Sequence, residues 1–189
     1  NIVYRADAGS GLLTRFAGGG SASPGDGAAA TQARLVGPRG MALDGNGGLL
    51  VSDGPDQRVR RIDLATGVIT TFAGTGATGF SGDGGPAASA RLNLPYSGAL
   101  ATDGSGNVYI ADGGNGRIRR VGATDGRIST VAGGGSTGFD TPVDALEAVI
   151  YQPQAIAVDA AGNIVFSYRN GDAMARYDAG TRKVAPFGR

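Results

Sequence analysis

Cysteine and histidine are both absent from this chain of 189 residues. Their absence excludes disulfide bonds, thiolate nucleophiles, imidazole bases and the usual zinc ligands. Glutamate is almost absent too, because Glu147 is its single example. Neither a signal peptide nor a membrane-spanning run is visible. We therefore expect no membrane insertion, no metal and no cofactor held by these residues.

An excess of charge of one sign is also lacking, since 17 Lys and Arg residues face 16 Asp and Glu residues. The net charge of +1 creates no overall field to attract nucleic acid. Two basic segments, residues 58–61 and 117–120, still stand out. Nucleic-acid binding would require stacking aromatics beside them, whereas aspartates are interleaved with them. We expect solvated cross-strand ion pairs here, and no nucleic-acid partner.

Glycine, in contrast, is abundant at 36 residues, and a hydrophobic content of 41% is typical of a soluble globular protein. The glycines separate short apolar runs that recur in a repeat. Pro38, Pro95 and Pro153 mark its period, because they lie 57 and 58 residues apart. A repeat of this length, built from short apolar runs, indicates an array of β-sheets.

Each repeat contains four apolar runs of four to six residues, which predicts a four-stranded antiparallel sheet with strands A to D. Strand A is short and apolar, as expected of an innermost strand buried on both faces. Strand C alternates, so that arginine stems lie along the surface. Strand D carries Ser and Thr, which suits an outer edge. In the second full repeat the four runs are residues 99–101, 108–111, 117–121 and 128–131.

The connections have their own signatures. The A to B connections begin at Asp44, Asp103 and Asp159 and contain Gly or Asn, which predicts hairpin turns. A calcium loop at residues 103–107 is the alternative, but it lacks the acidic residues and the distal glutamate that such a loop requires. The long D to A connections are rich in glycine. In one of them, Pro86 followed by alanines predicts one or two helical turns that end before Pro95.

Several segments together carry a family resemblance. They are residues 71–76, 80–87, 101–103, 107–112, Asn115 and residues 117–121. They resemble the NHL repeat in its long-loop bacterial form, which is also similar to that of teneurins. The resemblance covers essentially the whole chain. It implies an all-β fold, a β-propeller that is usually six-bladed, with blades packed face to face around an axis.

About three and a half blades are present. We divide the chain into a half blade with its connecting loop (1–38), two blades (39–95 and 96–153) and a last blade (154–189). The first part aligns with strands C and D only. A half ring exposes two apolar blade faces, so we expect a segment of a longer propeller, or a second copy that closes the ring. In the last blade, Tyr168, Ala173 and Pro186 depart from the repeat.

Variable loops on a rigid scaffold are where binding is expected. In a propeller the D to A and B to C connections emerge on one face. The candidate partner-binding residues there are Phe80, Asp83, Asp112, Asn115, Phe139 and Asp140. Two interpretations remain open. Either the phenylalanines are apolar anchors for a partner and the others polar contacts, or each Phe packs its loop onto the blade and each Asp caps a turn.

Two functions follow from the resemblance. The first is a non-catalytic recognition or structural scaffold, bacterial and extracellular or at the cell surface, that binds a protein or glycan partner through the long-loop face. The alternative is a six-bladed propeller hydrolase or lyase with an axial metal. Such sites resemble clusters of His, Glu, Asp and Asn, so their ligands would have to lie outside this segment.

Overall fold

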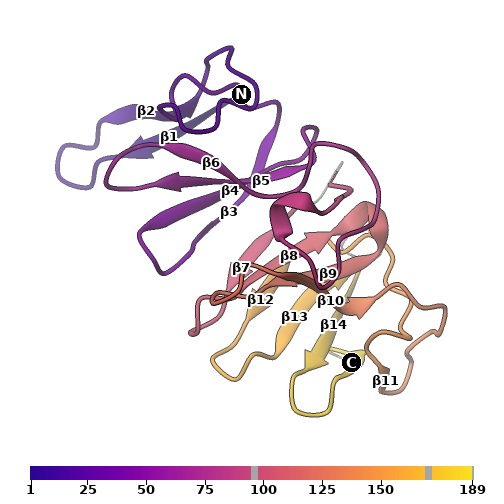
Figure 1. Cartoon of the computed structure of the whole chain (residues 1–189). Helices are drawn as coiled ribbons and strands as arrows, with labels where there is room; N and C mark the ends of the chain where they lie inside the picture. Colours follow the sequence, from indigo (N-terminus) through magenta and orange to yellow (C-terminus); the bar gives the residue numbers. More distant parts are fainter. Residues whose placement is uncertain (95–97, 169–171, 189) are drawn as a thin grey trace.

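Four antiparallel sheets follow one another along the chain and form an arc in the computed structural model of the protein (Figure 1). The structure describes residues 1–94, 98–168 and 172–188. Pro95, the predicted end of a helix and of a blade, lies outside the described residues, as do 96–97, 169–171 and 189. The expected all-β fold of four-stranded antiparallel sheets is confirmed.

The first sheet has two strands, the next two sheets have four each, and the last has five. Within each larger sheet the strands run in sequence order from the inside outwards, except that β11 is added beyond β15. The strands are β1 (Ile2–Ala6), β2 (Leu13–Gly18), β3 (Pro38–Leu43), β4 (Gly48–Asp53), β5 (Arg58–Asp63), β6 (Ile69–Ala73), β7 (Leu100–Thr102), β8 (Val108–Asp112), β9 (Arg117–Val121), β10 (Ile128–Gly133), β11 (Val143–Asp144), β12 (Ile156–Val158), β13 (Ile164–Tyr168), β14 (Ala173–Asp178) and β15 (Lys183–Pro186).

The hydrophobic core lies between successive sheets. Because side chains alternate along a strand, each inner sheet contributes to two clusters. In β8, Ile110 packs toward Leu50 of the preceding sheet, whereas Ala111 packs toward Phe166 of the following sheet. The side chains of Leu50, Ile110 and Phe166 are each at most 1% exposed. The sheets therefore pack face to face, as blades do.

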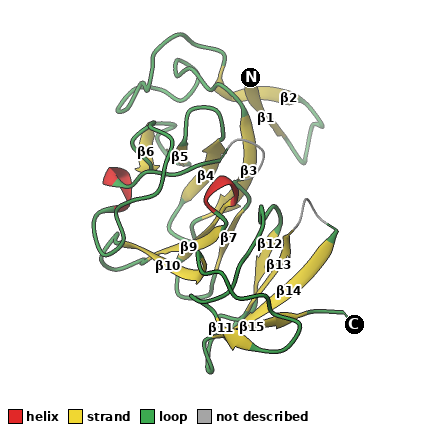
Figure 2. Cartoon of the chain, turned by 90° about the vertical axis from the view of Figure 1, so that its right-hand side faces the viewer, coloured by secondary structure: helices red, strands yellow, loops and turns green. Residues whose placement is uncertain are grey.

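The innermost strands are more exposed than predicted. The structure contradicts the expectation of burial on both faces, because Met41 and Leu43 of β3 are 54% and 61% exposed. The strands β3, β7 and β12 lie side by side along the inner edge of the arc (Figure 2). Since the described sheets form an arc and not a closed ring, one side of this edge is open to solvent.

A shared irregularity shapes the outer strands. In each of the first three sheets the pairing between the last two strands shifts by one residue, which leaves Phe16, Phe72 and Val131 as bulged residues. Two residues later the chain leaves the sheet at a glycine with positive φ, such as Gly133 at 87°. A Cβ atom there would lie 2.2 Å from the carbonyl oxygen of Gly116, so the turn into the long loop requires glycine.

The predicted helical segment after Pro86 is confirmed at the shorter of the two expected lengths. It is a single turn of 3₁₀ helix, η1 (Ala87–Ser89), and Pro86 occupies its N-cap position. The chain before this turn is engaged in backbone bonds to the next sheet, because Ile128 accepts from the N–H of Gly84 and donates to the carbonyl of Gly85. After the turn, Ala90 is extended, and Ala90 and Leu92 accept from the backbone N–H groups of Thr75 and Gly79, so the helix does not continue.

The predicted hairpin turns are confirmed at Asp44, Asp103 and Asp159. One carboxylate oxygen of each accepts backbone N–H bonds from residues two and four positions later, at 2.7–2.9 Å. Burial alone would raise the pKa of Asp103, but donors from Asn107, Tyr109 and the turn backbone lower it below 3.8. The carboxylate therefore stabilises the turn in its ionised form.

Candidate binding face at the long loops

Each long loop crosses from its own blade to the next one. Three backbone bridges at corresponding places join a loop to the outer strand of the following sheet: Ala29 with Val68, Pro86 with Arg127, and Val143 with Val184. In the last case the bridge is long enough to count as the strand β11. The loops are therefore pinned between blades and form part of the rigid scaffold.

Arg119 is the centre of one loop junction. It projects from β9 and is 0% exposed. Its guanidinium group donates to Asp83 at 2.6 Å, to Asp112 at 3.2 Å and to the carbonyl of Ser81 at 3.2 Å. The prediction of solvated pairs is wrong for this residue, since the pair with Asp112 crosses from β9 to β8 but is fully buried, and the pair with Asp83 joins β9 to a loop. The cause is the preceding loop, which folds over the strand and excludes water.

Arg60 repeats this arrangement one blade earlier. It is also 0% exposed, and its Nη2 atom donates to Asp26 in the preceding loop. The partner aspartate has a side chain 40% exposed, almost the same as the 39% of Asp83. The Nε and Nη1 atoms of Arg60 have no hydrogen-bond partner among the described residues. A buried arginine of a strand therefore pairs with a loop aspartate in two successive sheets, and Arg60 forms fewer hydrogen bonds than Arg119.

Asp112 binds Arg119 and also residues of the chain before and after its own strand. It is fully buried at the end of β8 and accepts a hydrogen bond from the backbone N–H of Asn93 at 2.8 Å. The side-chain amide of Asn115 donates to Asp112 at 2.8 Å and to the carbonyl of Gly79 at 2.8 Å. Burial raises the pKa of Asp112, although these donors and Arg119 oppose the shift. Asp112 and Asn115 thus fix the loop position.

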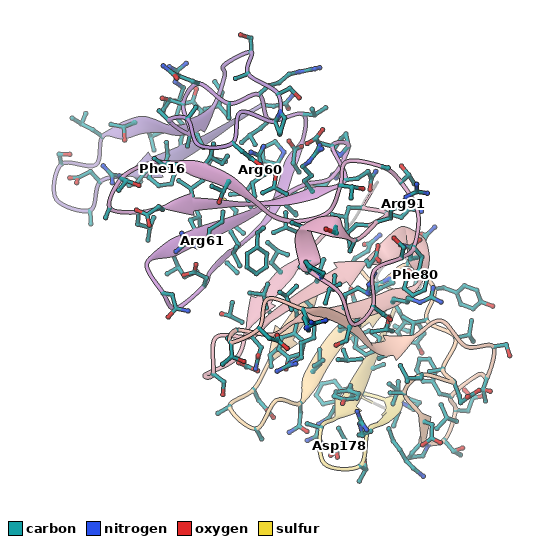
Figure 3. The ribbon with its side chains drawn as sticks, viewed as in Figure 1. Phe16, Arg60, Arg61, Phe80, Arg91 and Asp178 are labelled. Carbon is teal, nitrogen blue, oxygen red and sulfur yellow. The ribbon has the colours of Figure 1, made fainter. Side chains whose placement is uncertain are left out.

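Phe80 is the exposed aromatic side chain of this junction, at 43%. Its ring lies beneath the guanidinium groups of Arg117, 3.8 Å from the ring centroid, and Arg119, at 4.8 Å. Cation–π contact of this kind holds the ring in place while leaving one side open to solvent. Figure 3 shows Phe80 and the exposed Arg91 close together on the long-loop side of the molecule.

Phe139 lies differently, although it occupies the same place in the next loop. It is 7% exposed, and its ring centroid is 5.1 Å from that of Tyr168. Tyr168 in turn lies 6.3 Å from Phe166. Asp140, beside Phe139, is exposed. Phe139 therefore packs its loop onto the last blade, whereas Phe80 remains partly accessible.

The six candidate residues thus fall into two groups. The structure brings Phe80, Asp83, Asp112 and Asn115 together around Arg119, and it places Phe139 and Asp140 at the neighbouring junction. Sequence reasoning missed the buried arginines. The signal was present, because Arg60 and Arg119 each stand in a repeat whose preceding loop carries an aspartate, Asp26 or Asp83.

The described residues contain neither a membrane-spanning helix nor a cluster of metal-ligating side chains. No helix among them is long and apolar enough to span a membrane. Within residues 1–94, 98–168 and 172–188, no three His, Cys, Asp or Glu side chains gather closely enough to hold a metal ion.

Known proteins match this arrangement. A sequence model of the Teneurin NHL domain matches residues 8–79. Teneurin-1 of Mus musculus is 33% identical over 104 residues, which are 49% of this chain and 4% of that protein. The chain thus spans about 4% of the length of the curated relatives it matches.

Solved structures agree in fold. A protein of unknown function from Bacteroides thetaiotaomicron superposes on 97% of this chain with a TM-score of 0.70 and 22% identity, covering 42% of that protein chain. A chain from a nidogen/laminin complex superposes on 97% with a TM-score of 0.62 and 14% identity, over 53% of its own length. The resemblance predicted from the repeats is confirmed: residues 8–79 match the Teneurin NHL domain, and the fold is that of part of a β-propeller.

Proposed function

We propose that this chain is a non-catalytic recognition scaffold that binds a protein partner through the long-loop face. The observation that carries the proposal is Phe80, an aromatic ring 43% exposed and held in place by Arg117 at 3.8 Å. Aromatic and arginine side chains supply most of the binding energy in protein interfaces. A ring that is already fixed loses little conformational entropy when a partner covers it.

The neighbouring charges favour a partner with acidic side chains. Arg91 is exposed beside Phe80, and Arg117 is partly exposed. Arg119 is already engaged with Asp83 and Asp112, so it is not available to a ligand. An aspartate or glutamate of a partner can accept hydrogen bonds from the free donors of Arg91 and Arg117. The match of residues 8–79 to the Teneurin NHL domain and the likeness to a chain of a nidogen/laminin complex support a role in protein binding.

The proposal includes location and assembly. The teneurin relatives support an extracellular or cell-surface setting. The apolar residues at the two ends of the arc, among them Tyr4 at 57% exposure and Met174 at 47%, support closure of the ring by further blades or by a second copy. A closed ring would keep the loop face of this chain free, because the contacts that close it use the faces of the sheets.

Site-specific photo-crosslinking tests the loop face. A photoreactive phenylalanine analogue is introduced at Phe80 and, as a matched control, at Leu64. Leu64 is 45% exposed, and its backbone N–H donates to Gly47 of the β3–β4 hairpin turn and not to a long loop. We expect a protein adduct in the source cells from position 80 and none from position 64. Equal adducts at both positions, or none at position 80, would refute the proposal.

Binding by the captured protein then provides the quantitative test. F80A should weaken its affinity by at least about tenfold, because truncation of an aromatic anchor costs about 2 kcal/mol or more. L64A should leave the affinity unchanged. Unchanged circular dichroism of F80A would show that the loss is not caused by unfolding.

A further inference from the structure

A groove of about 840 Å³ lies between the sheet β7–β10 and the last sheet, on the side of the hairpin turns. One wall contains Tyr109 and Arg120, and the other contains Tyr177 and the β14–β15 turn. Its volume is within the range of small-molecule sites. Its lining includes neither Phe80 nor Arg119, so it is distinct from the aromatic surface proposed to bind a partner, although Thr130 in its lining donates to Asp83 at 2.7 Å.

The preceding pair of sheets has the corresponding groove, but its volume is only about 180 Å³. The two grooves are lined at matching places, by Asp44 and Arg61 in one and by Asp103 and Arg120 in the other. A major difference is the bulged residue of the outer strand. Phe72 fills the small groove, whereas Val131, in the same bulge, leaves the large one open.

The large groove has an ordered polar wall. The Tyr109 hydroxyl donates to Asp103 at 3.1 Å, and the Nη2 atom of Arg120 donates to Asn107 at 2.6 Å. Asn107 also donates to Asp103 at 2.7 Å, which links the two pairs. Since Tyr109 is only 5% exposed, its ring is fixed in the core. These groups are therefore oriented before any ligand arrives.

The opposite wall offers unpaired acceptors. The side chains of Asp144 and Glu147 are exposed, and neither forms an ion pair within the part of the chain that the structure describes. Arg182 lies beside them, where its carbonyl accepts from the N–H of Ala145. Exposed carboxylates and the guanidinium group of Arg120 therefore line the same groove.

We propose that this groove binds a neutral oligosaccharide. A sugar hydroxyl both donates and accepts hydrogen bonds, so it can donate to the carboxylates of Asp144 and Glu147 and accept from Arg120. Leu146, which lines the groove and is 57% exposed, supplies apolar surface for the C–H groups of the sugar. Three carboxylates, counting Asp103, line the groove with two arginines. This near balance disfavours a strongly anionic or cationic ligand.

The test measures binding of neutral hexasaccharides to the full chain by saturation-transfer NMR and calorimetry. The probes are maltohexaose, cellohexaose, mannohexaose, xylohexaose and chitohexaose at millimolar concentration. We expect at least one to bind. V131F should weaken that binding at least about tenfold, because a phenylalanine at the bulge narrows the groove as Phe72 does.

Two further variants keep the test decisive. F72V changes only the small groove and should bind as the wild type does. E147A removes an exposed acceptor without touching the core and should weaken binding even if V131F does not fold. Binding by none of the five probes would overturn the proposal, as would wild-type affinity in E147A. F80A should have no effect here, which separates this outcome from the test of the protein-binding face.

Discussion

The loop junction of the blade 96–153 is polar, whereas the corresponding junction of the last blade is aromatic. Asp112 pairs with Arg117 in the ladder β8–β9, and Tyr168 pairs with Ala173 at the same place in β13–β14. Two residues further along the second strand of each pair, Arg119 pairs with Ile110 in β8–β9. At the same place in β13–β14, Ala175 pairs with Phe166.

The difference shows that one structural task has two physical solutions. Both junctions hold a long loop against the next blade. The polar one does so through a buried ion pair, whose mutual attraction offsets the desolvation of both charges. The aromatic one does so by burying Phe139 against Tyr168, with no charge to desolvate. A consequence is that Phe80 stays partly exposed beside the arginines, whereas Phe139 is buried by its packing against Tyr168.

The largest expected effect is that of R119A. It leaves Asp112 buried without its cation, so we expect a loss of about 4 kcal/mol in the free energy of unfolding. Urea denaturation followed by circular dichroism measures it. R120A provides the control, because that side chain is partly exposed. Similar losses in the two variants would contradict a special role for the buried pair.

In the aromatic junction, F139A should cost about 3 kcal/mol, because truncating a buried phenylalanine removes its transfer free energy and leaves a cavity. Thermal unfolding and urea denaturation both measure this loss. A change below about 1 kcal/mol would mean that the loop repacks freely and that Tyr168 does not need its partner.

A double variant can replace the charged residues of the polar junction by the residue types of the aromatic one. D112Y/R119A places a tyrosine opposite Phe80 and removes both charges. We expect it to be more stable than R119A alone by about 1–2 kcal/mol, since apolar replacement of a buried ion pair avoids an unpaired charge. The same urea titrations decide this. If the double variant is the less stable of the two, the junctions are not interchangeable.

F80A should lower the free energy of unfolding by less than about 1 kcal/mol, because its ring is partly exposed and its main contact is cation–π. Paired with F139A, it measures how far the two phenylalanines differ. Equal losses in both variants would show that Phe80 is a packing residue like Phe139.

The smallest effect concerns pH. The pKa of Asp103 is lowered in the folded chain, so its stabilising contribution is present above the ordinary value of 3.8 and is lost as the pH falls through the lowered value. In D103N the fall in stability below that pH should be less steep than in the wild type. Urea titrations at a series of acidic pH values measure the slope. An unchanged slope would mean that other carboxylates control acid unfolding.

The fold was predictable because its signals are local and repeated. A short apolar run that ends in a glycine such as Gly133 forms a strand followed by a turn. Asp103 and its equivalents form hairpin turns through bonds to their own backbone, and neither feature depends on the surrounding sheets. The exposure of β3 was not predictable, since it depends on how far the sheets curve around the axis. The end of the helical turn after Ser89 was not predictable either, since Ala90 and Leu92 are held by backbone bonds from Thr75 and Gly79, at the start of the same loop.

The sequence by itself determined the repeat, the four-stranded sheets, the hairpin turns and the absence of thiol and imidazole chemistry. Only the tertiary structure decided which side chains meet: Arg119 with Asp83, Phe80 with Arg117, and Phe139 with Tyr168. The physical reason is that strand formation depends on neighbours along the chain, whereas burial and ion pairing at the junctions depend on where each loop crosses to the next blade.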